Sequence, residues 1–229
     1  MRAKQLRETA LLLFACLLAA AAGYALVQAG QLWAALALPA VVALFALRQK
    51  RRIAIRRAGA DGERDTLRLL AALPRSWVVL PDVTIAYRGH KSQVDYVLLC
   101  PTAVLVLECK NLSGIVSGKA GDRELRHYKP AKNGRPAEQK TLYNPVKQVQ
   151  GHAITLGRVL SAAGLDIPVH TGVYFANPRA DVRIDGATHI WTASGSRTLT
   201  EILPDFAAKQ RERVPVKQAV KAIRRSMVR

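Results

Sequence analysis

The sequence contains little cysteine, and its three cysteines, Cys16, Cys100 and Cys109, do not follow the spacing of a metal site. This scarcity excludes a disulfide-stabilised scaffold and a zinc ribbon, and it favours a reducing compartment. The length of 229 residues leaves no room for two full catalytic domains. Half of the residues are hydrophobic, which excludes a disordered or fibrous protein.

Acidic residues are also scarce: 16 Asp and Glu stand against 35 Lys and Arg, so that the formal net charge is +19. The excess is concentrated at the two ends of the chain. Residues 1–60 carry nine basic residues and one acidic residue, and residues 207–229 carry eight and one. The stretch between them is nearly balanced, as in an ordinary soluble domain. Both ends are therefore expected to meet an anionic partner.

Two stretches near the N-terminus contain no charged residue, from Ala10 to Val27 and from Leu32 to Leu47. Each is close to the roughly 17–25 residues that a membrane-spanning helix needs, and the short polar break between them fits a tight hairpin. Basic residues precede the first run and follow the second, and basic flanks remain in the cytoplasm. We therefore predict a membrane anchor over residues 1–57, with transmembrane helices at about 10–27 and 32–47. Both termini would be cytoplasmic, as in a multi-pass protein of the cytoplasmic (inner) membrane.

A cleaved signal peptide is the alternative interpretation of the first run, because Val27-Gln28-Ala29 could serve as a processing site. The second run would then still span the membrane, and the basic segment after it would keep the remainder in the cytoplasm. A third interpretation, a helical hairpin buried in a soluble protein, would require a large core around uncharged helices.

Beyond the anchor, the order of predicted elements is typical of an α/β sandwich with a mixed sheet. Two of the helices begin at capping residues, Asp61 and the Asn144-Pro145 pair. The expected helices cover residues 62–73, 145–163, 199–209 and 216–227. The expected strands cover residues 77–80, 83–87, 93–100, 103–110, 168–175 and 188–192. The polar segment 117–143 is predicted to form a long loop or an irregular hairpin.

Two predicted strands flank Pro101-Thr102, so we expect a hairpin with a two-residue loop. In that register Asp95 lies directly opposite Glu108, where like charges repel. Glu108 and Lys110 share one face of the sheet, because side chains alternate along a strand. Two carboxylates between apolar strands are costly unless positive charge lies near them. A divalent cation, with Lys110 close by, would supply that charge.

Helical spacing places two more polar residues near these carboxylates. Glu63 lies four residues before Leu67 and seven before Leu70, so it is expected on their inward face. Gln148 lies in the first turn of the helix that starts at Asn144-Pro145, and a helix N-terminus favours phosphate. Plain structural roles remain open for both: Glu63 as an acid favoured by the helix dipole, and Gln148 as a surface residue.

In this order, Glu63, Asp95, Glu108-Cys109-Lys110 and Gln148 resemble the site pattern of the PD-(D/E)XK nuclease superfamily. More closely, the sequence resembles the nuclease-related domain (NERD) family over about residues 60–176. The resemblance is carried by Gly62-Glu63, Gln93-Val94-Asp95, Leu107-Glu108-Cys109-Lys110-Asn111 with Ser113-Gly114, and Tyr143-Asn144-Pro145-Val146-Lys147-Gln148. Val94 replaces the superfamily's nominal proline, at a position that supplies no chemistry.

The resemblance implies a restriction-endonuclease-like mixed β-sheet flanked by helices over residues 58–195, preceded by the transmembrane hairpin and followed by basic helices over 196–229. It implies that Mg²⁺, or Mn²⁺, is bound by Asp95, Glu108 and the backbone carbonyl of Cys109, helped by Glu63. Lys110 would position or deprotonate the attacking water. Gln148 would orient the site or the substrate. The implied activity is hydrolysis of DNA phosphodiester bonds at the cytoplasmic face of the membrane.

Residues 119–147 are consistent with a nucleic-acid partner, because eight basic residues stand there against three acidic ones, with His127, Tyr128 and Tyr143 among them. A solvated loop is the plain alternative. His152 lies four residues after Gln148 and could reach the site. The basic last helix could lie on anionic lipid, extend the nucleic-acid surface or pack on the domain.

Two other functions remain open at this point. A non-catalytic, membrane-tethered module could bind nucleic acid or protein on the same fold. The protein could instead be a structural membrane protein whose function is carried by the predicted transmembrane hairpin.

Overall fold

The computed structural model describes residues 61–131 and 136–228, a helical segment at 43–49 and five isolated positions among the first 28 residues. The chain divides into two compact units, Met1–Ala58 and Gly59–Arg229. Within the described part of the chain, no helix combines the length and the apolar character that crossing a membrane requires. Most of the residues of the predicted spans at 10–27 and 32–47 lie outside the described residues, so the membrane anchor stays a prediction.

The larger unit is built around a five-stranded mixed sheet in the order β1-β2-β3-β7-β9. Its strands are β1 (Val78–Tyr87), β2 (His90–Cys100), β3 (Ala103–Lys110), β7 (Val169–Phe175) and β9 (Ile190–Thr192). The first three strands are antiparallel neighbours, whereas β7 and β9 run parallel to β3. The predicted mixed sheet is therefore confirmed.

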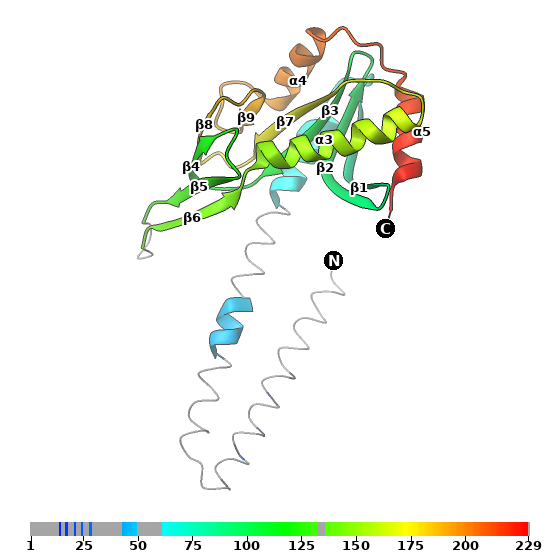
Figure 1. Cartoon of the computed structure of the whole chain (residues 1–229). Helices are drawn as coiled ribbons and strands as arrows, with labels where there is room; N and C mark the ends of the chain where they lie inside the picture. Colours follow the sequence, from blue (N-terminus) through cyan, green and yellow to red (C-terminus); the bar gives the residue numbers. More distant parts are fainter. Residues whose placement is uncertain are drawn as a thin grey trace. The chain divides into compact units, whose positions relative to one another are not determined.

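Helices cover both faces of this sheet, which gives three layers (Figure 1). Helix α3 (Pro145–Ala162) lies across one face, and α5 (Val216–Ser226) lies beside it. Helix α4 (Leu199–Ala208) and the helical residues 61–71 contribute to the core on the opposite face. This arrangement buries the central strands on both sides, and strands of that kind are nearly continuous apolar runs, as residues 103–107 are.

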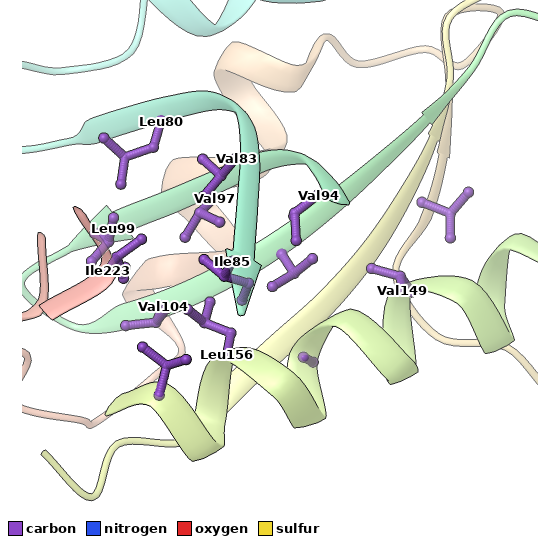
Figure 2. Packing of buried hydrophobic residues seen from close by; sticks show 14 of the residues in the cluster. Leu80, Val83, Ile85, Val94, Val97, Leu99, Val104, Val149, Leu156 and Ile223 are labelled. Carbon is purple, nitrogen blue, oxygen red and sulfur yellow. The ribbon is translucent and has the colours of Figure 1, made fainter. Parts of the chain in front are cut away.

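The core consists of two clusters, one on each face of the sheet. Alternation along β3 sends Val104 and Val106 toward α3, and Leu105 and Leu107 toward the other face. Figure 2 shows the first cluster, in which side chains from the strands meet Val149 and Leu156 of α3 and Ile223 of α5. At β3, the apolar pattern ends with Glu108 and Lys110, so the polar site begins where the core stops.

Of the two alternatives predicted for residues 117–143, the long loop is wrong and the hairpin is nearer the structure, because the described residues of this segment form antiparallel strands of a second, four-stranded sheet. Its order is β6-β5-β4-β8, with β4 (Gly114–Lys119), β5 (Glu124–Lys129), β6 (Glu138–Tyr143) and β8 (Ala180–Asp185). In β5, Leu125 and His127 are buried, whereas Glu124, Arg126 and Tyr128 are exposed. A sheet with one solvated face needs few apolar residues in each strand, so its composition resembles that of a loop.

Three local expectations also need correction. Asp61 is itself helical, so it is not the N-cap of the helix. Leu67 is 39% exposed, and the inward face of this helix is formed instead by Thr66 and Leu70. The two short strands expected around Pro81-Asp82 form one strand, β1, which pairs with β2 in one register on both sides of Asp82. Asp82 has a left-handed backbone with φ 48°, and the alternation of buried side chains changes at this point, since Leu80 and Val83, three residues apart, belong to the same cluster.

Candidate active site

A polar pocket of about 600 Å³ opens where the strands β2 and β3 meet the first turns of α3. Its lining includes every residue that the sequence predicted for the site, and these residues come from four separate segments of the chain. They are Glu63 from the helical residues 61–71, Asp95 from β2, Glu108, Cys109 and Lys110 from β3, and Gln148 from α3. The structure therefore brings the whole predicted set together.

Lys110 is held by two of these residues. Its Nζ donates to Glu108 Oε1 at 2.6 Å and to Gln148 Oε1 at 3.1 Å. Glu108 is 1% exposed, whereas the Lys110 side chain retains 24% exposure. Alternation along β3 puts both on one face, and the N-cap at Asn144 starts α3 so that Gln148 reaches them. The ammonium group therefore has a fixed position at the boundary between the core and the pocket.

Asp95 is placed by the hairpin between β2 and β3. The predicted register is confirmed, with partners running from Cys100↔Ala103 to Tyr96↔Leu107. Asp95 and Glu108 are the next residues on the two strands. The Asp95 Oδ2 atom accepts a hydrogen bond from the backbone N–H of Cys109 at 2.8 Å. This bond ties the Asp95 carboxylate to the strand that carries Glu108.

Glu63 reaches the pocket because its helix is tied to both strands. The Tyr96 hydroxyl donates to the Glu63 backbone carbonyl at 2.6 Å, and Thr66 Oγ1 lies 3.2 Å from Cys109 Sγ. Gly62 permits this approach, since a Cβ atom there would lie 2.5 Å from the Cβ of Asn111. The Glu63 side chain itself is exposed on the rim of the pocket.

The three carboxylates of the pocket make it electrostatically unfavourable for a further negative charge. Burial raises the pKa of Glu108 to about 7; Lys110 acts against this shift, and Asp95 adds to it. Burial, and then the charge of Asp95, also raise the pKa of Glu63. Burial raises the pKa of the Cys109 thiol to about 12, so this side chain is a neutral core group. A cation would favour the ionised form of the buried carboxyl.

The donor set of the pocket fits a hard divalent cation. The Oε2 atom of Glu108 is buried and has no hydrogen-bond partner among the described residues. Such a cation accepts carboxylate and backbone oxygens and completes its shell with water or phosphate. The described residues contain no cluster of three or more His, Cys, Asp or Glu side chains close enough to hold a metal. For three or more of these side chains to bind one cation, they would therefore have to move closer together, and water or phosphate would complete the shell.

Sequence reasoning placed His152 within reach of the pocket but missed Ser92. Ser92 and His152 also line it, and Ser92 Oγ lies 2.6 Å from His152 Nδ1. His152 Nε2 lies 3.6 Å from Glu108 Oε2. Burial lowers the pKa of His152, which favours the neutral ring. The helical spacing from Gln148 indicates that His152 could reach the pocket, but no pattern around Ser92 in the sequence marks it.

Comparison with known proteins agrees with this geometry. The family model described as nuclease-related domain (NERD) matches residues 58–176. No curated protein and no solved structure matches the chain. The matched segment covers more than half of the chain and includes the four segments that build the pocket. The chain therefore belongs to the nuclease-related domain (NERD) family.

Proposed function

We propose that the protein is a membrane-anchored, Mg²⁺-dependent nuclease that hydrolyses phosphodiester bonds of DNA at the cytoplasmic face of the membrane. The observation that carries this proposal is the convergence of Glu63, Asp95, Glu108 and Lys110 in one pocket of a nuclease-related domain. Three carboxylates that share one pocket repel one another, so stability alone gives little reason for these residues to gather from distant parts of the sequence.

The residues proposed to hold Mg²⁺ are Asp95, Glu108 and the backbone carbonyl of Cys109, helped by Glu63. The buried Oε2 atom of Glu108 supports this choice, because it has no hydrogen-bond partner in the described part of the chain. A bound divalent cation would polarise the phosphodiester and lower the pKa of water.

Lys110 is proposed to act directly on the substrate. Its ammonium group is fixed by Glu108 and Gln148 and remains partly exposed to the pocket. A preorganised positive charge beside a phosphate stabilises the negative charge that develops during hydrolysis, and it also favours a deprotonated attacking water. Gln148 then acts through Lys110, since its Oε1 atom holds the ammonium in place.

The rim of the pocket supports a nucleic-acid substrate. Lys91, Lys147 and Tyr143 line it, and Tyr143 is 52% exposed. Lysine side chains neutralise backbone phosphates, and an exposed tyrosine ring offers a surface for base stacking. These residues would hold a strand across the pocket opening.

The proposed anchor is the segment 1–57, with the nuclease domain over 58–195 and basic helices over 196–229. The two uncharged runs and their basic flanks support it. Tethering would confine cleavage to DNA close to the membrane.

Cleavage of plasmid DNA by the full chain in detergent tests the activity. With Mg²⁺ present, we expect the Asp95→Ala and Lys110→Ala variants to be slower than wild type by at least about 100-fold. Exposed residues outside the pocket offer matched controls, so Asp166→Ala and Lys209→Ala should cleave at the wild-type rate. Equal cleavage by wild type and both pocket variants would refute the enzymatic assignment. DNA binding without cleavage, in Mg²⁺ and in Mn²⁺, would favour the non-catalytic module.

A further inference from the structure

Two buried polar atoms in the pocket face each other without a hydrogen bond. They are Glu108 Oε2 and His152 Nε2, which lie 3.6 Å apart and have no hydrogen-bond partner within the described residues. The two side chains are 1% and 14% exposed. A buried polar group without a partner destabilises a fold, and such groups are rare in native proteins. Two of them at one place indicate that a group absent from the protein itself completes both.

Ser92 determines how the His152 ring is oriented. Its Oγ atom lies 2.6 Å from Nδ1, and Ser92 is only 7% exposed. When Nδ1 carries the proton and donates it to Ser92, the lone pair of Nε2 points at the Glu108 oxygen. Two acceptor atoms then face each other, an arrangement that a cation between them would stabilise. Histidines that bind metals are oriented in this way, with the second ring nitrogen donating to a fixed acceptor.

We propose that His152 Nε2 is a ligand of the divalent cation next to Glu108 Oε2, and that Ser92 orients this ligand. The proposal rests on the metal site of the proposed function and adds a residue to it. The separation of 3.6 Å exceeds a hydrogen bond. It is slightly longer than the roughly 3.0–3.4 Å between neighbouring ligand atoms that each lie about 2.1 Å from one ion, so a bound cation would draw the two side chains together.

An imidazole ligand changes which cation the site prefers. Mg²⁺ takes oxygen ligands almost exclusively, whereas first-row transition metals accept imidazole nitrogen together with carboxylate. The mixed set of Glu108 and His152 should therefore raise the affinity for Mn²⁺ relative to the affinity for Mg²⁺, and this gain should depend on His152.

Electron spin-echo spectroscopy of bound Mn²⁺ tests this directly, because it detects a ¹⁴N nucleus in the coordination shell. The full chain is solubilised in nonionic detergent, treated with chelator and loaded with Mn²⁺. We expect ¹⁴N coupling in wild type, and its loss in His152→Gln. Mn²⁺ affinity, measured from the signal of free Mn²⁺, should fall by at least about tenfold in that variant. His90 lines the same pocket, so His90→Gln is the matched control and should retain the coupling.

The outcomes separate this inference from the proposed nuclease activity. The inference that His152 is a ligand would be overturned if wild-type protein that has bound Mn²⁺ showed no ¹⁴N coupling. This measurement does not depend on the folding of any variant. Loss of the coupling in His90→Gln but not in His152→Gln would also overturn the inference. Coupling that depends on His152 in a protein that cleaves no DNA would support the ligand while refuting the activity. DNA cleavage by a protein without the coupling would support the nuclease activity while refuting His152 as a ligand.

Discussion

Glu108 and Lys110 form an ion pair at the boundary between the core and the pocket. The carboxyl is almost fully buried, and burial raises its pKa to about 7 although the Lys110 ammonium lies at 2.6 Å. Without a bound cation, the protonated and ionised forms are therefore close in free energy near neutral pH. Any change that removes positive charge near Glu108 should shift this balance toward the protonated form.

Replacing Lys110 by Met tests that balance. The Lys110 ammonium opposes the effect of burial, so its removal should raise the pKa of Glu108 above about 7 in protein free of divalent cations. Carboxyl ¹³C NMR of the full chain, recorded across a pH titration, measures the shift. Lys147→Met is the control, since Lys147 lines the pocket but is not a cause of the Glu108 shift. An unchanged Glu108 titration in Lys110→Met would contradict the electrostatic account.

At the scale of elements, the start of α3 connects the two sheets. Asn144 is fully buried, and its Oδ1 atom accepts from the N–H of Val146 at 3.0 Å. Its Nδ2 group donates to the carbonyls of Lys119, Ala120 and Asp122. One side-chain amide thus caps the helix that carries Gln148 and also donates hydrogen bonds to the backbone carbonyls of the turn between β4 and β5.

Asn144→Ala should destabilise the domain by at least about 2 kcal/mol, because the cap is lost and buried carbonyls are left without their donor. Thermal unfolding of the full chain measures this. Gln150 is exposed on the same helix, so Gln150→Ala should change stability by less than about 0.5 kcal/mol. Similar stabilities of the two variants would show that the Asn144 contacts contribute little.

The second sheet contains a buried histidine that should make folding sensitive to acid. Burial lowers the pKa of His127, although its hydrogen bond from Nε2 to the Ser113 carbonyl acts in the opposite direction. The neutral ring is therefore favoured in the folded state. As the pH falls through about 6.5, the unfolded chain binds a proton that the folded chain does not, and stability declines.

Comparing thermal unfolding at pH 7.5 and pH 5.5 in wild type and His127→Gln isolates the contribution of His127 to the loss of stability in acid. Glutamine can still donate to the Ser113 carbonyl but does not titrate. Wild type should lose more stability than the variant on acidification, by at most about 1.4 kcal/mol per pH unit. Equal losses in both proteins would show that His127 does not contribute.

The sequence predicts some elements of the fold better than others, and the reasons are physical. The two-residue loop Pro101-Thr102 fixed the β2–β3 register, and Asn144-Pro145 marked the start of α3, because turn and cap chemistry is local. The second sheet was missed since its strands are short and half solvated. Ser92 was missed because its contact with His152 joins residues sixty positions apart, and nothing local marks it.

At the scale of the whole molecule, the net charge of +19 is concentrated at the two ends of the chain, and the uncharged runs follow the first basic residues. The account predicts that the full chain sediments with membranes and stays there after alkaline carbonate extraction. Removal of residues 1–57 should release the remaining protein into the soluble fraction. Persistent membrane association of the truncated chain at high salt would locate the anchor elsewhere.

The central claim is that one cation-dependent hydrolytic centre is built from Asp95, Glu108 and Lys110. The most direct test is the rate of DNA cleavage by the full chain as Mg²⁺ is removed by chelation and then restored. The account predicts that wild type loses its activity and recovers it. Glu108→Gln, which keeps the shape of the side chain and removes its charge, should remain inactive after Mg²⁺ is restored. Cleavage that survives chelation, or that Glu108→Gln performs at the wild-type rate, would contradict the account.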